Sequence, residues 1–324
     1  MNKGVFPMKR TLTALLCLLL LLPAALSLGE EPMRVYTLAG PTGMGMAGIM
    51  EANEGEYAFT LCSAANDIVA AIASGSADVA ACPTNLAATL YHKTSGAVQL
   101  LALNTLGVLH VVTADEHIQS VQDLAGRTVH ATGQGSVPEY VLRYILEQNG
   151  LADSVTVEYV AEHSELATLL AAGRAEIGVL PEPHVTSALM QNDSLRAALD
   201  VTALFEDAAR ADGKADMVLS MGCVIVRRAY AQEHPEAVAQ LLSDYAASVE
   251  RVNADVSAAA QLVQKHGILP KAAVAERAIP NCHIVFVTGD AMRAQIEPLY
   301  QLLYDANPAS VGGALPDDAF YYVP

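Results

Sequence analysis

Short apolar runs alternate with amphipathic stretches over the first two thirds of the chain. Runs typical of strands occupy residues 33–39, 57–63, 77–82, 98–104, 106–113, 127–130 and 155–160. Between most of them, apolar residues recur every three or four positions, which is typical of helices that bury one face. Strands that alternate with helices predict an α/β fold with largely parallel sheets, covered by helices on both faces.

Two stretches of this pattern match each other without a gap. Residues 66–83 and 164–181 each read as a helix that begins with a capping residue and an acid, then Gly-x-Ala-acid, then an apolar strand that ends in proline. A matched helix, turn, strand and proline is difficult to obtain by chance. The chain therefore contains two similar α/β lobes.

The last third of the chain is mainly helical. An apolar run at 217–226 predicts a strand that returns to the first lobe, and helices are expected at 235–253, 255–266, 271–279 and 290–307. The tail at 315–324 carries three aromatic residues and is expected to pack on the first lobe. Crossings near residues 115 and 215 would then form a hinge.

The N-terminus resembles an export leader. Met8, Lys9 and Arg10 precede an apolar run that is too short to span a bilayer comfortably, and small residues near Glu30 permit cleavage. Cys17 raises the question of a lipid anchor, but it lies in the middle of the run and follows a leucine. The expected organisation is a leader at 1–29, a first lobe at 30–115 and 216–324, and a second lobe at 116–215.

Charge excludes two classes of partner. The net charge is −17, and it becomes −20 without the leader's Lys3, Lys9 and Arg10. Such a surface repels nucleic acid and anionic lipid. We expect neither as a partner.

Four cysteines lie beyond the leader, and an oxidising compartment permits disulfides between them. Cys62 and Cys82 each fall within an apolar strand, and no pair shows the Cys-x-x-Cys spacing of a metal site. We therefore expect buried free thiols, and no metal.

A glycine loop marks the start of the second lobe. After the strand at 127–130, the loop at 131–135 contains Gly133 and Gly135, and Ser136 stands where a helix N-cap would, ahead of Pro138. Such a loop offers backbone N–H groups and a positive helix end to an anionic or strongly polar ligand. It can equally be a tight connection alone.

Ligands of open parallel sheets bind beyond the carboxyl ends of the strands. Glu182 is fixed between Pro181 and Pro183 at such an end, where it either pairs with a ligand amine or faces solvent. His110, His184 and His283 lack metal-site spacing and are expected to be structural or on the surface. The candidates for ligand contact are Thr42, Gly43, Met44, Asn66, Thr84, Asn85, Thr105, Gln134, Gly135, Ser136, Glu182 and Ser220.

One motif suggests a cofactor. Gly43, Gly45 and Gly48 follow a strand and open a helix, which fits the dinucleotide-binding pattern loosely. However, Asp67 is placed to cap a helix rather than to end a strand, and the sister loop has Pro138 instead of a third glycine. We expect no cofactor. Motifs of hydrolases, zinc proteases and P-loop enzymes are absent from the sequence.

With the lobes and strand ends in place, the chain resembles the solute-binding proteins of ABC importers, in the group that binds nitrate, alkanesulfonates, taurine and thiamine-type pyrimidines. The resemblance covers about residues 33–324. It is carried by Gly75-x-Ala77-Asp78-Val79 with Pro83-Thr84-Asn85, by Asp123-Leu124-x-Gly126-Arg127-Thr128-Val129, by Gly173-x-Ala175-Glu176-Ile177, and by Pro181-Glu182-Pro183.

The resemblance implies a two-lobed periplasmic-binding-protein type II fold with a cleft between the lobes. It implies an exported, non-catalytic protein that captures a small polar or anionic solute (sulfonate-, nitrate-, taurine- or pyrimidine-like) and docks on a permease with its ATPase, contacting the membrane only through the permease. In sulfonate binders the counterparts of Gly135 and Ser136 hold the anionic head. Pro181 stands where many relatives carry Trp, so an aromatic clamp is not expected there.

Two alternatives remain open at this stage. One is an enzyme on the same fold, of the pyrimidine-precursor synthase or menaquinone-pathway dehydratase type, although the leader and the lack of a cysteine-rich motif disfavour it. The other is a ligand-sensing subunit that serves a receptor.

Overall fold

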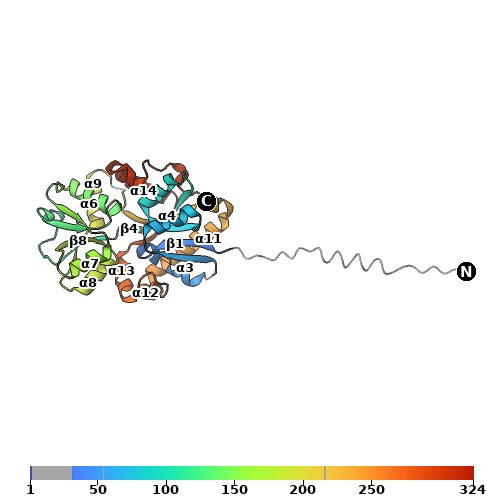
Figure 1. Cartoon of the computed structure of the whole chain (residues 1–324), viewed down its shortest axis with the longest axis horizontal. Helices are drawn as coiled ribbons and strands as arrows, with labels where there is room; N and C mark the ends of the chain where they lie inside the picture. The colour runs from blue at the N-terminus through green and yellow to red at the C-terminus, as the bar shows by residue number, and fades with distance from the viewer. Residues whose placement is uncertain (2–30, 54, 215–216) are drawn as a thin grey trace. The chain divides into compact units, whose positions relative to one another are not determined.

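The computed structural model describes Met1 and residues 31–53, 55–214 and 217–324. The predicted leader and Cys17 lie outside these residues. Residues 33–324 form one compact unit built around two sheets (Figure 1). No helix in the described ranges is long and apolar enough to cross a membrane.

The first lobe contains a six-stranded sheet in the order β11-β4-β10-β3-β1-β2. β1 pairs in parallel with β2 and β3, whereas β10 lies antiparallel between β3 and β4. The strands are β1 (Met33–Leu38), β2 (Tyr57–Cys62), β3 (Val79–Pro83), β4 (Val98–Leu106), β10 (Ser220–Arg227) and β11 (Ile284–Val287).

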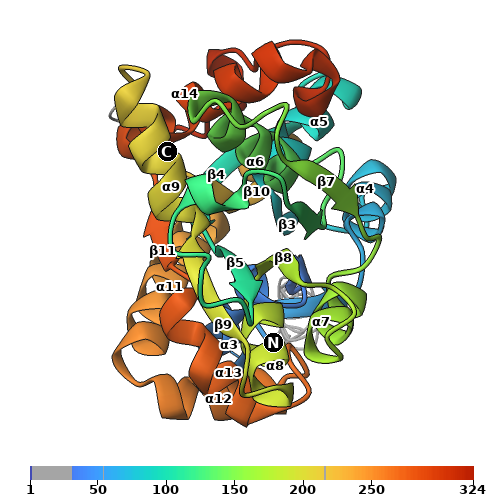
Figure 2. The ribbon, with the colours of Figure 1, turned by 90° about the vertical axis from the view of Figure 1, so that its left-hand side faces the viewer.

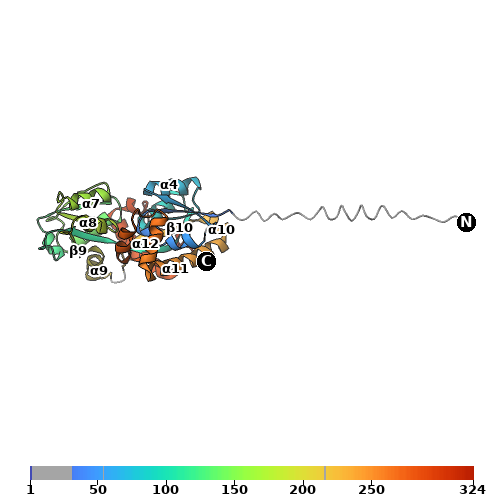
Figure 3. The ribbon, with the colours of Figure 1, turned by 90° about the horizontal axis from the view of Figure 1, so that it is seen from below.

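Apolar side chains of this sheet point alternately to two cores. Val79 and Ala81 of β3 face one, and Ala80 and Cys82 face the other. Figure 3 shows α4 on one side of the sheet and α11 and α12 on the opposite side. The helices of the first lobe are α2 (Pro41–Met44), α3 (Ala47–Ala52), α4 (Ala65–Ser74), α5 (Thr84–Lys93), α10 (Arg228–Glu233), α11 (Pro235–Ala254), α12 (Val256–Lys265), α13 (Ala272–Ala278) and α14 (Gly289–Ala306).

The second lobe contains a five-stranded sheet in the order β7-β6-β8-β5-β9. Figure 2 looks onto it, with α6 and α9 toward one side and α7 and α8 toward the other. Its elements are β5 (Leu109–Thr113), β6 (Thr128–Ala131), α6 (Val137–Gln148), β7 (Thr156–Tyr159), α7 (His163–Ala171), β8 (Ile177–Pro181), α8 (His184–Gln191), β9 (Arg196–Asp200) and α9 (Val201–Ala211).

The repeat in the sequence corresponds to α4 and β3 in one lobe and α7 and β8 in the other. The acid after each Gly-x-Ala turn pairs with an arginine at the start of the lobe's first βα unit. Asp78 binds Arg34 at 2.6 Å, and Glu176 binds Arg127 at 2.7 Å. The matched pattern therefore records a shared fold and a shared ion pair, although only Asp78 is buried.

The first crossing between the lobes lies earlier than the sequence predicts. We expected residues 106–113 in the first lobe and the boundary near 115, but β5 pairs antiparallel with β8 and β9 in the second sheet. The chain leaves the first sheet after Leu106, and Gly107 and Val108 form the connection. β5 and β10 are antiparallel to their neighbours because each enters its sheet from the other lobe. Both sheets are therefore mixed, and the prediction of largely parallel sheets is wrong.

The first crossing is packed closely. A side chain at Gly107 would overlap Thr202 at the start of α9, and the Gly107 carbonyl is hydrogen-bonded to the His283 ring. The second connection lies between α9 and β10. That these two segments act as a hinge stays a prediction.

Two further predictions are confirmed. The cysteines at positions 62, 82, 223 and 282 are free and buried. In the tail, Phe320 is fully buried against Tyr91, with 5.1 Å between ring centroids, and Tyr321 forms a bridge to Leu100 of β4.

Candidate functional site

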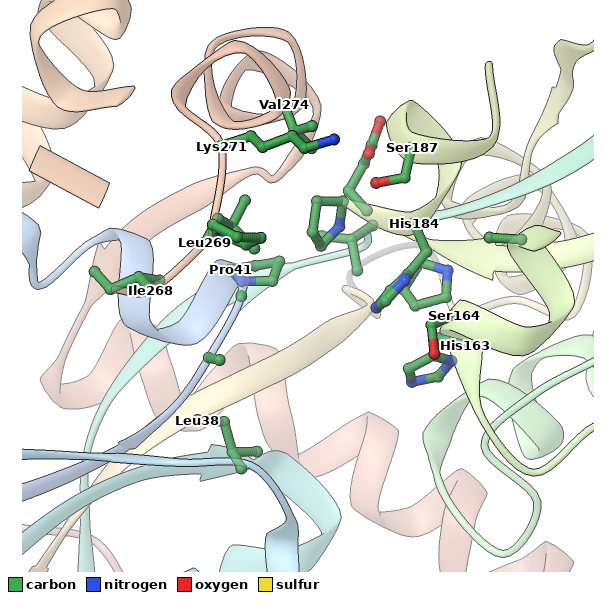
Figure 4. Close-up of a pocket in the computed structure, with 18 of the residues that line it drawn as sticks. Leu38, Pro41, His163, Ser164, His184, Ser187, Ile268, Leu269, Lys271 and Val274 are labelled. Atoms are coloured by element: carbon green, nitrogen blue, oxygen red, sulfur yellow. The ribbon is translucent and has the colours of Figure 1, made fainter. Parts of the chain in front are cut away.

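A cavity of about 820 Å³ lies where loops and helix starts of the two lobes face each other. The first lobe contributes the β1–α2 connection, Thr105, Met221 and the segment from Gly267 to Val274. The second lobe contributes Val108, the strand end at 181–183, the first half of α7 and residues along the whole of α8. Figure 4 shows Pro41, Ile268 and Leu269 on one side of this cavity and His163 and His184 on the other.

The first-lobe wall is mainly apolar, with two threonines. The hydroxyl of Thr42 donates to the carbonyl of Leu38 at 3.3 Å. Thr105 is 1% exposed, and its hydroxyl has no hydrogen-bond partner within the described part of the chain. A buried unpaired hydroxyl at a cavity wall is a donor or acceptor that a ligand can satisfy.

Two histidines stand together on the second-lobe wall. The ring centroids of His163 and His184 are 5.3 Å apart, and His163 Nδ1 lies 2.6 Å from the hydroxyl of Thr132. Burial lowers the pKa of His163, and burial together with His163 lowers the pKa of His184 to about 4. Both rings are therefore neutral near pH 7, and each can donate one hydrogen bond and accept one.

Glu182 follows β8 and is 3% exposed at the cavity wall. Its carboxylate accepts hydrogen bonds from the Thr186 N–H at 3.1 Å and the Thr186 hydroxyl at 3.0 Å. A longer bond of 3.5 Å comes from Asn281 of the first lobe. Burial raises the pKa of this carboxyl, and the three hydrogen bonds oppose that shift.

Of the residues that the sequence proposes for ligand contact, the structure brings Thr42, Thr105 and Glu182 to the cavity. Gly43 and Met44 are buried and do not line it. Thr84 and Ser220 are buried and do not line it either, and the Thr84 hydroxyl donates to the Ser220 carbonyl at 2.8 Å.

Other candidates lie away from the cavity. Asn85 is directed at the carbonyl of Ser310 at 3.4 Å, so it helps to hold the C-terminal segment. Asn66 is exposed in the first turn of α4. Thr84, Asn85 and Asn66 follow their strands as predicted, but their side chains face other parts of the first lobe or solvent.

Two donors of the glycine loop of the second lobe form hydrogen bonds within the chain. The N–H of Gly135 donates to the Glu139 carboxylate at 2.6 Å, and the hydroxyl of Ser136 donates to the Gly133 carbonyl at 2.7 Å. Gln134 is exposed, and none of these loop residues lines the cavity. Ser136 stands at the N-cap position of α6 without a side-chain capping hydrogen bond, and the role of the loop as a ligand jaw stays a prediction.

Sequence reasoning missed several wall residues. His184 was expected to be structural or on the surface, yet it lines the cavity together with His163, Ser187 and Met190. One signal was available, because His163 begins the helix that repeats α4 and His184 follows the Pro-Glu-Pro strand end. No local signal marks residues 267–271, which reach the cavity from a helix connection far along the chain.

The glycines of the dinucleotide-like motif serve helix packing. A side chain at Gly48 would lie 2.6 Å from the Ser248 hydroxyl, and one at Gly45 would lie 3.1 Å from the Tyr245 hydroxyl, both on α11. Within the described ranges, no group of three or more His, Cys, Asp or Glu side chains is placed to hold a metal ion.

Comparison with known proteins identifies the protein family. The family profile described as "ABC transporter, phosphonate, periplasmic substrate-binding protein" matches residues 50–271. The chain belongs to this family. It is thus a solute-binding component of an ABC importer, and proteins of this family are binding proteins rather than enzymes.

Solved structures show the same type II periplasmic-binding-protein fold. An ABC transporter protein from Parabacteroides distasonis has a TM-score of 0.78 at 20% identity, with 91% of this chain and 99% of that chain covered. The aliphatic sulphonate-binding protein SsuA of Escherichia coli has a TM-score of 0.69 at 17% identity, with coverage of 89% and 92%. The alkanesulfonate-binding protein SsuA of Xanthomonas axonopodis pv. citri, bound to MOPS, has a TM-score of 0.63 at 17% identity, with coverage of 90% and 95%. No curated protein sequence matches the chain.

Proposed function

We propose that this protein is exported and captures a small organic solute in the cavity between its lobes. The observation that carries the proposal is that a cavity of about 820 Å³ is walled by both lobes of a substrate-binding family member. A site shared by two lobes is completed only when they approach each other. A solute that contacts both lobes therefore binds the closed state best and shifts the population toward it.

The closed form then docks on a permease that works with an ATPase. The protein contacts the membrane only through this permease, and it performs no catalysis.

The size of the cavity favours an organic solute. Cavities of roughly 300–1,000 Å³ hold organic ligands, and a bare nitrate would leave most of this one unfilled. Sulfonates, phosphonates, taurine-like and pyrimidine-like compounds all fit by volume.

A thermal-shift screen tests the proposal. The library contains phosphonates, sulfonates, taurine, nitrate, pyrimidines and small amines, and a true ligand raises the melting temperature by mass action. Each hit is repeated on Ser187→Trp, which fills part of the cavity, and on Ser243→Trp, which changes an exposed position on α11.

We expect the hit to be lost in Ser187→Trp and kept in Ser243→Trp. A library without a single hit, or a hit that survives Ser187→Trp undiminished, contradicts capture in this cavity. A genome neighbourhood without permease and ATPase genes favours the receptor subunit as the partner.

A further inference from the structure

The chemistry of the residues that line the cavity indicates which class of solute it binds, provided that the proposed function holds. The first-lobe wall of the cavity is mostly apolar, with Leu38, Pro41, Leu269 and Val274 among its residues. Burying apolar ligand surface against such a wall contributes roughly 25 cal/mol per Å². A solute that uses this wall needs an apolar body, and a compact oxyanion does not have one.

The charged groups of the wall do not suit an anion. Among the described residues that line the cavity, none is an arginine, and the single lysine, Lys271, is exposed. An exposed ammonium stays hydrated and is screened by salt. The bidentate hydrogen bonds with which guanidinium groups recognise phosphonate and sulfonate oxygens are therefore not available from these residues.

Glu182 makes the wall less favourable still for an anion. None of its three hydrogen-bond donors is cationic, and it takes part in no ion pair within the described ranges. Asp78, another buried acid of this protein, is by contrast held by both Arg34 and Arg227. The carboxylate at the cavity is thus compensated by neutral dipoles only, and a negative ligand nearby experiences its charge in a poorly screened setting.

The two second-lobe helices that begin at the cavity, α7 and α8, carry acids of this chain at their starts, and these disfavour an added anion. Glu182 accepts the Thr186 N–H in the first turn of α8. Glu165 lies in the first turn of α7. The Glu182 carboxylate occupies the position that a ligand anion would take at the N-terminus of α8.

What remains for a ligand is a set of neutral hydrogen-bonding groups. The His163 and His184 rings and the hydroxyls of Thr105 and Ser187 line the same cavity. Both rings are uncharged near neutral pH because burial disfavours their protonation. Groups of this kind recognise the edge of a polar heterocycle, an amide or an amine.

We propose that the cavity selects an uncharged or positively charged organic solute with an apolar body, and that it discriminates against phosphonates and sulfonates. The apolar surface holds the body, the neutral donors and acceptors orient the polar edge, and Glu182 supplies the discrimination against anions.

A series of probes with one apolar body tests this selection. Benzylphosphonate and benzenesulfonate are the anions, benzamide and benzyl alcohol the uncharged probes, and benzylamine and benzamidine the cations. Isothermal titration calorimetry on the full mature protein measures each dissociation constant. The better uncharged or cationic probe is expected to bind at least about tenfold more tightly than either anion, because a buried carboxylate without a cationic partner lies in the wall.

Glu182→Gln removes the charge and keeps a hydrogen-bond acceptor for Thr186. It is expected to reduce the preference against the anions by about tenfold, whereas Glu250→Gln, which removes an exposed charge from α11, leaves the ranking as it is. If Glu182→Gln does not fold, the ranking of the six dissociation constants on the wild-type protein still tests the proposed selection against anions.

Tighter binding of either anion overturns this inference and leaves the proposed function in place. If none of the six probes binds, the inference that the apolar wall holds an apolar body is overturned as well. The proposed function fails separately, when the wider library that includes the small phosphonates, sulfonates and nitrate gives no hit.

Discussion

Acidification should destabilise this protein through His184. An unfolded histidine has a pKa near 6.5, whereas burial, together with the neighbouring His163, lowers the pKa of His184 in the fold to about 4. Between these values the unfolded chain binds a proton at this position and the folded chain does not. The free energy of unfolding therefore decreases as the pH falls through this window, and the contribution of His184 is fully present only above about pH 6.5.

The magnitude follows from the two pKa values. Their separation corresponds to about 3 kcal/mol at 1.36 kcal/mol per pH unit, and about 2 kcal/mol of it is lost between about pH 7 and about pH 4.5. His163 adds to the loss, because burial lowers its pKa also. Glu182 opposes it, because burial raises the pKa of its carboxyl and the folded state gains a proton more readily than the unfolded one.

A variant isolates the histidine from these opposing groups. Urea denaturation of wild type and His184→Asn at about pH 7 and about pH 4.5 gives the two differences in the free energy of unfolding, and wild type should lose about 2 kcal/mol more than the variant. Asp115, whose pKa is lowered to about 2, acts only below this window. Equal losses in the two proteins would refute the assignment of a neutral buried imidazole to His184.

Three further predictions concern the scaffold. Asp78→Asn should lower the free energy of unfolding, measured by urea denaturation, by about 3 kcal/mol, because it leaves two guanidinium groups without their buried acid. Glu176→Gln changes the exposed acid at the matching position of the repeat and should have little effect. Equal costs would mean that burial does not distinguish the two pairs. Phe320→Ala should cost about 3–5 kcal/mol and Phe320→Leu clearly less, if the tail is part of the first-lobe core. A thiol reagent should leave the cysteines at positions 62, 82, 223 and 282 unmodified in the native protein and react with all of them in denaturant, and any shortfall in denaturant would reveal a disulfide.

The internal repeat was readable from the sequence because its signals are local. A capped helix, a Gly-x-Ala turn and an apolar strand each depend on residues within a few positions of one another, so α4 with β3 and α7 with β8 could be predicted. The partners of the two acids were not readable, since Arg34 and Arg127 lie 44 and 49 residues away along the chain.

The position of the first crossing was not readable for a different reason. Residues 98–113 form an almost continuous apolar stretch, and such a stretch fits a buried strand of either lobe. Only the pairing of β5 with β8 and β9 assigns it to the second sheet. Tertiary pairing, rather than the pattern along the chain, determines the boundary.

The cavity was predictable in part. The rule that ligands bind beyond strand ends found Thr42, Thr105 and Glu182, because each follows or ends a strand that points toward the other lobe. The same rule selected Thr84 and Asn85, which also follow a strand but have their side chains committed to Ser220 and Ser310. Which strand-end residues face the cavity depends on how the C-terminal segment covers the first lobe, and no local pattern encodes that.

The central claim is that a solute is bound between the lobes and favours their approach. Small-angle X-ray scattering of the mature protein, with and without a saturating hit from the thermal-shift screen, measures this directly through the radius of gyration. The account predicts a smaller radius with the ligand and no change in Ser187→Trp. An unchanged radius in the wild-type protein with the ligand fully bound would contradict lobe closure around the solute.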